Sequence, residues 1–136
     1  MNKVRFLFFN SRDELYRVDI EKIVYFEADG NYTNFVLCNG QKGVVGQNLS
    51  GMQKVLSANL REQASTFARI GKRFIVNLRY VYHIEVLRQR LTLSDGDRFA
   101  YQLPVSKDAL KKLKELYLLS SMKATAQQAS LNKQSV

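Results

Sequence analysis

The side chains best suited to bind a partner in this sequence are polar groups at three expected junctions between elements. They are Asn31 and Asn34, Lys72 and Arg73, and Ser106 and Lys107. Amide, guanidinium, ammonium and hydroxyl groups are the types that read base edges and hold phosphates in nucleic acids. The three pairs are therefore candidate nucleic-acid contacts.

Lys72 and Arg73 indicate contact with nucleic acid more clearly than Ser106 does. Lys72 and Arg73 follow Gly71 in a break between two expected strands, which favours exposed side chains and contact with nucleic acid. Ser106 has two interpretations. It can act as a plain N-cap of the following helix, or it can help that helix terminus to hold a phosphate with free backbone N–H groups.

No constellation in the sequence supports an enzyme or a metal site. The chain lacks a P-loop, a dinucleotide-binding glycine motif, a zinc-protease motif and a nucleophile elbow. Cys38, the only cysteine, is interpreted as an inert structural thiol, and His83, the only histidine, as a core-edge or surface residue. Asp29 is explained by its turn and not by pairing with Glu27. We predict no catalytic residue, no metal and no cofactor.

The charge of the chain is concentrated in one segment. The 136 residues include 21 Lys+Arg and 12 Asp+Glu, a net charge of +9. Residues 61–90 hold seven basic residues against two acids, a net of +5, which is more than half of the excess. Such a localised excess favours a polyanionic partner, either nucleic acid or an anionic membrane surface. The alternative is that several of these side chains are merely solvated.

Length and composition exclude several classes of protein. A chain of 136 residues fits one domain with a short tail. One cysteine cannot form an internal disulfide, which excludes an exported disulfide scaffold. The apolar run at residues 6–9 is too short for a signal peptide or a spanning helix, so we expect a cytoplasmic location.

Runs of apolar, aromatic and β-branched residues, one alternating segment at residues 15–20 and several turn signals predict a mostly β chain. The expected strands are residues 4–9, 15–20, 23–28, 32–37, 41–45, 67–70, 74–78, 80–87, 90–93 and 98–103. Turn signals occur at residues 29–31, 39–40 and 95–96. Gly40, Gly43 and Gly46 are interpreted as turn and bulge glycines.

Apolar residues at helical spacing predict two short helices, over residues 49–59 and 106–118. Strand signals separate them, so they cannot form a helix-turn-helix, and in a DNA-binding protein loops or strands would have to reach the bases. Residues 119–136 are polar and rich in Ala, Gln and Ser. We predict that they form a disordered tail after a domain spanning residues 1–118.

Three stretches in this order resemble a known family. They are residues 23–33 (IVYFEADGNYT), 67–81 (FARIGKRFIVNLRYV) and 103–107 (LPVSK), the last followed by a basic helix. Together they resemble the LytTR-type DNA-binding domains of bacterial transcription regulators, over about residues 3–118. The block from Arg69 to Tyr80 is the most specific part of the resemblance.

The resemblance implies a mostly β fold of stacked small antiparallel sheets with two short helices. It also implies sequence-specific binding to double-stranded DNA by loops that insert into successive major grooves and bend the duplex, commonly as dimers on paired direct repeats. The DNA-binding residues implied by position are Asn31, Thr33, Asn34, Lys72, Arg73, Ser106 and Lys107, with Arg69, Arg79 and Lys111 as phosphate contacts.

The sequence departs from the family pattern in two respects. Gly71 stands where the family often has His, and Arg73 where it often has Ser, which leaves the base preference of this loop open while the positive charge is retained. The family often carries an N-terminal receiver domain, whereas this chain begins almost at its first expected strand. We therefore expect the regulatory signal to come from a separate sensory partner protein.

The residues by themselves also allow a second class of function. The basic helix at residues 106–118 could serve a protein–protein or membrane-surface interaction module. Core packing explains the apolar residues of this helix more simply, so DNA binding is the leading hypothesis.

Overall fold

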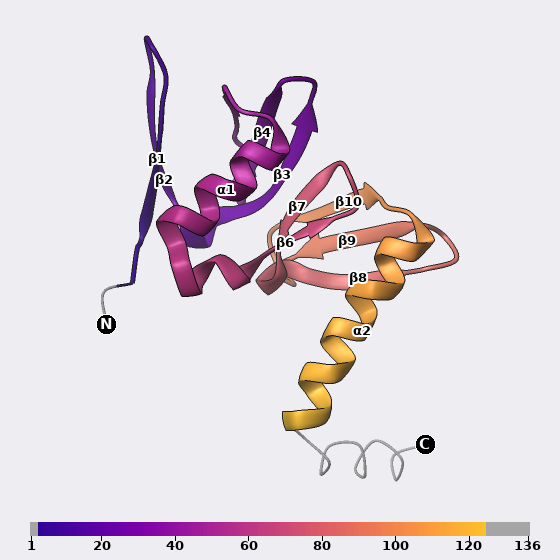
Figure 1. The fold of residues 1–136 in the computed structure, drawn as a ribbon. Coiled ribbons are helices and arrows are strands. Elements are labelled where there is room, and N and C mark those ends of the chain that lie inside the picture. Colours follow the sequence, from indigo (N-terminus) through magenta and orange to yellow (C-terminus); the bar gives the residue numbers. More distant parts are fainter. Residues whose placement is uncertain (1–2, 125–136) are drawn as a thin grey trace, which may run out of the picture.

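The chain folds into three antiparallel sheets and two α-helices (Figure 1). The computed structural model describes residues 3–124. A two-stranded sheet pairs β1 (Phe6–Asn10) with β2 (Leu15–Asp19). A five-stranded sheet has the order β5-β4-β3-β7-β6, built from β3 (Ile23–Asp29), β4 (Tyr32–Leu37), β5 (Lys42–Val45), β6 (Phe67–Ile70) and β7 (Phe74–Asn77).

The other elements are a three-stranded sheet, two α-helices and short 3-10 helices. A three-stranded sheet has the order β10-β9-β8, built from β8 (Val81–Glu85), β9 (Arg90–Ser94) and β10 (Ala100–Pro104). The helices are α1 (Leu49–Leu60) and α2 (Lys107–Ala124), and short 3-10 helices form at Ile20–Lys22, Arg61–Thr66 and Leu78–Tyr80.

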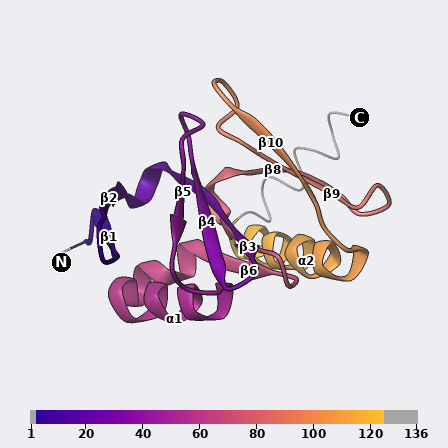
Figure 2. The same cartoon turned by 90° about the horizontal axis from the view of Figure 1, so that it is seen from above.

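The five-stranded sheet is the middle layer, and apolar side chains cover both of its faces. On one face Phe26 and Phe35 pack against α1 and the β1–β2 hairpin. On the other face Val36 and Val76 pack against the three-stranded sheet and α2. Burial on both faces explains why these strands read as continuous apolar runs and not as an alternating pattern. Figures 1 and 2 show the hairpin beside α1 and α2 beside the three-stranded sheet.

An irregularity in β3 adjusts which side chains face each layer. The pairing with β4 shifts register between Ile23 and Tyr25. As a result Val24 and Tyr25 both lie in the core shared with α2, whereas Ile23 and Phe26 lie in the core shared with α1. One extra residue in a strand is the usual cause of such a change of face.

Gly43 has a different role from the one predicted. It lies in β5 directly opposite Phe35 of β4, and a Cβ atom at this position would overlap the Phe35 ring. Its φ is not in the left-handed region, unlike that of Gly40, which forms the predicted turn at φ +86°. The interpretation of Gly43 as a turn or bulge glycine was therefore wrong. The position lacks a side chain because an aromatic ring of the neighbouring strand covers it.

Side-chain hydrogen bonds hold both helices in place, at the start of α1 and along the middle of α2. The Asn48 side chain caps α1 and accepts a hydrogen bond from the Gly51 N–H at 2.8 Å. In α2 the Tyr117 hydroxyl donates to the Leu78 carbonyl, and burial raises the pKa of Tyr117 to about 12. The hydroxyl therefore remains a donor at neutral pH and fixes α2 to the segment after β7.

The expected fold class is confirmed, and most expected elements agree with the structure within two residues. The clearest differences are that β8 ends at Glu85, before the predicted residue 87, and that α2 continues to Ala124, beyond the predicted end at residue 118. Residues 125–136 of the predicted tail lie outside the described residues. No helix of the described part is both long and apolar enough to cross a membrane.

Candidate nucleic-acid interface

The three predicted junctions lie next to one another at one border of the molecule. β3 and β7 are neighbours, so the β3–β4 turn and the β6–β7 turn emerge side by side, and the Ala28 N–H donates to the Arg73 carbonyl at 2.8 Å. The start of α2 lies against the β6–β7 turn, because Gly71, Ala109 and Ser106 line the same groove. We call this border, formed by residues 29–34, 71–73 and 106–107, the basic edge.

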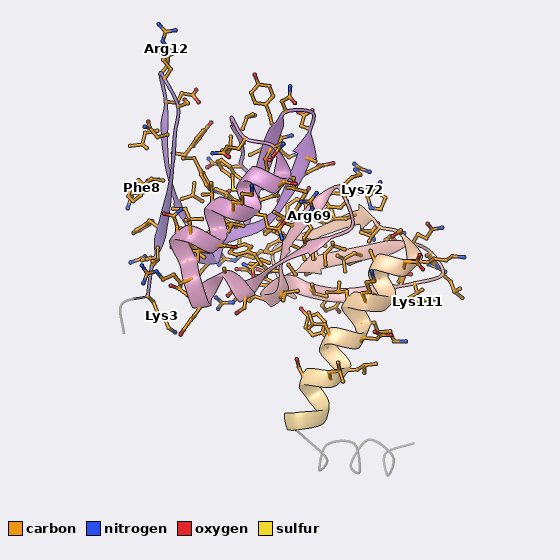
Figure 3. All side chains as sticks on the ribbon, viewed as in Figure 1. Lys3, Phe8, Arg12, Arg69, Lys72 and Lys111 are labelled. Carbon is orange, nitrogen blue, oxygen red and sulfur yellow. The ribbon has the colours of Figure 1, made fainter. Side chains whose placement is uncertain are left out.

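The β6–β7 turn presents two cations in different states. Gly71 has φ +64°, a conformation that favours glycine and directs the next two residues outward. Lys72 is exposed at the rim (Figure 3), and its ammonium forms no ion pair within residues 3–124. Arg73 is also exposed, but its guanidinium pairs with the Glu27 carboxylate at 2.8 Å. Lys72 is thus fully available to an anion, whereas Arg73 is already oriented by an acidic neighbour.

At the β3–β4 turn the structure exposes Asn31, leaves Asn34 half-buried and buries Thr33. Asn31 is exposed, and the Asn34 side-chain amide donates to the Asp29 carboxylate at 3.4 Å. Thr33 is fully buried, and its hydroxyl donates to the Gln47 carbonyl at 2.8 Å. The expectation that Thr33 contacts DNA is therefore corrected. Successive side chains of a strand point to opposite faces, and that of Thr33 points to the inner one. Its hydrogen bond connects the start of β4 to the segment before α1.

Ser106 caps the start of α2, as one of its two interpretations predicted. The Ala109 N–H donates to the Ser106 hydroxyl at 3.3 Å, and the Leu110 N–H donates to the Ser106 carbonyl at 3.0 Å. Ser106 and Lys107 are both exposed beside the β6–β7 turn, and Lys111 follows one turn along the same helix (Figure 3). A phosphate at this terminus would meet backbone N–H groups as well as cations.

Two of the three predicted phosphate contacts have other partners. Arg69 donates to Ser50 and Gln53 of α1, each at 3.3 Å, and to the Lys72 carbonyl at 3.1 Å. It therefore connects α1 to the β6–β7 turn, and its role is to position that turn. Arg79 lies beyond the opposite end of β7, where it pairs with Glu21 at 3.5 Å. It does not belong to the basic edge.

Replacing Arg69 with alanine is expected to loosen the β6–β7 turn without unfolding the domain. Three hydrogen bonds of the guanidinium disappear, and partly exposed bonds of this kind contribute about 1 kcal/mol each. Hydrogen–deuterium exchange should accelerate at the amides of residues 70–73. The conservative variant Arg69→Lys should restore part of the protection, because an ammonium cannot reach all three acceptors. If DNA affinity fell while exchange stayed the same, Arg69 would touch DNA directly.

Two neighbours of the edge were not singled out from the sequence. Glu27 is the acid that orients Arg73, and its strand position gave no indication of that contact. Arg88 is exposed on the β8–β9 turn, which is fastened to the basic edge because the Val105 N–H donates to the Gln89 carbonyl at 3.0 Å. In the sequence, only the position of Arg88 within the strongly basic residues 61–90 pointed to this residue. Within the described residues, no group of three or more His, Cys, Asp or Glu side chains could hold a metal ion.

Comparisons with known proteins agree with this geometry. The sequence model described as "LytTr DNA-binding domain" matches residues 13–118. Two heme-containing CO-sensing transcriptional regulators of Paraburkholderia xenovorans (strain LB400), RcoM 1 and RcoM 2, are 31% and 29% identical to 99 residues, or 73%, of this chain. The chain spans 34% of the length of each.

A solved structure shows the same fold. A LytTr DNA-binding domain from Bacillus cereus matches with a TM-score of 0.60 at 19% sequence identity, over 84% of this chain and 97% of that one. The family match runs from residue 13 to residue 118, so it covers α1, every described strand but the first, and α2 up to residue 118. The chain therefore belongs to the LytTr DNA-binding domain family.

Proposed function

We propose that the protein regulates transcription by binding double-stranded DNA in a sequence-specific manner through the basic edge. The observation that carries the proposal is the meeting of three polar junctions, from different elements, at one border of a LytTr fold. The charge excess of residues 61–90 contributes Lys72 and Arg73 to this border. Of the described helices only the first turn of α2 reaches the edge, so the β3–β4 and β6–β7 turns are the elements that would enter a major groove, which is about 12 Å wide.

The residues divide into two groups by chemistry. Lys72 and Arg73 would contact guanine edges or phosphates, and Asn31 or Asn34 would pair with adenine edges. Ser106, Lys107 and Lys111 would hold the backbone, because a helix terminus with cations suits a phosphate better than a base. We propose that the β3–β4 and β6–β7 turns enter successive major grooves, that the duplex bends to admit both, and that two copies bind paired direct repeats.

The alternative of a protein–protein or membrane-surface module keeps only part of its support. The first part of α2 packs its apolar residues into the core, since Leu110 is 0% exposed and Leu113 is 2% exposed, whereas Leu116 and Leu119 further along are 45% and 63% exposed. An interfacial helix would need the whole apolar face to be free. The regulatory signal is proposed to come from a separate sensory partner protein.

Selection from a random DNA library tests the proposal directly. The fragments bound by the full chain should share a repeated motif, and the selected duplex should bind at least about 1,000-fold more tightly than a scrambled one. The logarithm of the affinity should fall linearly with the logarithm of salt concentration, because phosphate contacts release counterions. Fragments without a common motif, or equal affinity for selected and scrambled duplexes, would contradict sequence-specific binding.

Bending and stoichiometry are measured on the same selected duplex. Gel mobility should vary when the site is moved along a fragment of constant length, as a bent complex requires. Mass measurement of the complex should give two copies on a duplex with both repeats and one copy on a duplex with a single repeat. Anionic liposomes at the same salt concentration should not compete with the duplex.

A further inference from the structure

A cavity of about 680 Å³ lies where the three sheets meet. Its wall is formed by Arg17 of β2, by Leu37 at the end of β4 with Cys38 in the turn that follows, and by Phe99 directly before β10 with Tyr101 at the start of that strand. Figure 2 shows the β4–β5 turn and the β9–β10 turn standing side by side above this junction, away from the β3–β4 turn of the basic edge. Its volume lies in the range of pockets that take small organic ligands.

One wall of the cavity is aromatic and held rigidly. Phe99 packs against Tyr101 with ring centres 5.5 Å apart and against Tyr80 at 5.2 Å. The Tyr101 hydroxyl donates to the Leu37 carbonyl at 3.1 Å, which fixes this ring to the end of β4. The wall therefore presents a preformed apolar surface suited to a planar ligand body.

Three cations, Arg17, Lys22 and Arg98, line the cavity together with two carboxylates that are already occupied. Asp95 accepts hydrogen bonds from the backbone N–H groups of residues 97, 98 and 99, and these bonds hold its pKa below the usual range. Asp19 accepts a hydrogen bond from the Glu21 N–H at 3.0 Å and lies 3.6 Å from Arg5. The carboxylates are thus engaged by other groups. Of the cations, Arg98 lies 3.9 Å from Asp97 in a fully solvated pair, and the Arg17 guanidinium lies 4.3 Å from the Phe6 ring centre. Solvated pairs of this kind contribute little free energy, so they leave both charges able to attract an anion.

We propose that this cavity binds a small organic anion with a planar, apolar body. The apolar body would lie against Phe99 and Tyr101, and its anionic group would be held by Lys22, Arg98 and Arg17. A ligand in this position contacts β4 and β10, whose opposite ends lead to Asn31 and Ser106 of the basic edge. The site itself does not depend on DNA binding, and its test uses no DNA.

The dye 8-anilinonaphthalene-1-sulfonate is a suitable probe, because it joins an aromatic body to one sulfonate. It should bind the folded chain saturably with one molecule per chain and raise its melting temperature. The uncharged analogue N-phenyl-1-naphthylamine has the same rings without the sulfonate and should bind more weakly. Equal affinity for the two dyes would overturn the anionic part of the proposal.

The single cysteine reports where the dye binds. Cys38 is half-buried in the cavity wall, so bound dye should slow its alkylation by iodoacetamide, measured by mass spectrometry of the full chain. The double variant Lys22→Ala/Arg98→Ala should bind the dye about fivefold more weakly, as the loss of two exposed charge contacts predicts.

A charge-matched control is Arg61→Ala/Arg79→Ala, in which neither residue lines the cavity. It should bind the dye as the wild type does. Unchanged dye binding in the cavity variant, or an unchanged rate of Cys38 alkylation with the dye bound, would overturn the proposal. The second outcome would place the dye elsewhere, for example in the groove between β6 and α2.

Discussion

Replacing Lys72 and Arg73 together with alanine is expected to weaken binding to the selected duplex roughly 30- to 700-fold, because each base or phosphate contact is worth about 1 to 2 kcal/mol here. Lys72 has no competing ion pair within residues 3–124, and Arg73 is already oriented by Glu27 at 2.8 Å. Equilibrium titrations at several salt concentrations measure the loss. A phosphate contact would lower the salt slope by about one per residue, whereas a base contact would relax specificity at one position.

The single variants separate the two roles. Lys72→Ala should act mainly on affinity and on the salt slope, since a flexible ammonium holds phosphates as a point charge. Arg73→Lys keeps the charge but loses the planar fork, so it should reduce discrimination among bases more than affinity.

The control for this experiment is Arg61→Ala/Arg79→Ala, which removes the same charge away from the basic edge. It should bind the selected duplex nearly as the wild type does. If this variant lost as much affinity as Lys72→Ala/Arg73→Ala, net charge and not the basic edge would govern binding. Full affinity in the Lys72→Ala/Arg73→Ala variant would show that the edge is misplaced.

Gly43→Ala is expected to destabilise the domain by about 3 kcal/mol, the upper end of the range for overpacked sites, and to lower its melting temperature by about 10 °C. The added methyl group would overlap the Phe35 ring. This ring cannot move aside, because it is 2% exposed and lies between Phe9 at 5.4 Å and Tyr16 at 5.1 Å. Thermal and urea unfolding measure the change.

Gly46→Ala is a matched control for the same chemical change in the same segment. A Cβ atom on Gly46 would meet no atom within 4 Å, and its φ is not in the left-handed region. Its stability should therefore stay equal to the wild type or rise by about 0.5 kcal/mol, since alanine reduces the freedom of the unfolded chain. Equal destabilisation by the two variants would show that the backbone at residues 43–46 matters more than the Phe35 ring.

The local pattern of the sequence was sufficient for most elements. Turn signals at residues 39–40 and 95–96 predicted hairpins that the structure contains, and helical spacing predicted α1 nearly to the residue. These features depend on interactions between residues close in the chain. The role of Gly43 could not be predicted, because it depends on a ring eight residues earlier that only strand pairing brings above it.

The sequence by itself determined the chemical types of the candidate site, the concentration of charge in residues 61–90 and the family, because these are properties of residue identity and order. Only the tertiary structure decided which side chains share a surface. It brought Asn31, Lys72 and Ser106 to one border, buried Thr33, and turned Arg69 toward α1. Exposure and partners are set by strand order and by helix packing across long chain separations, which no local pattern of residues specifies.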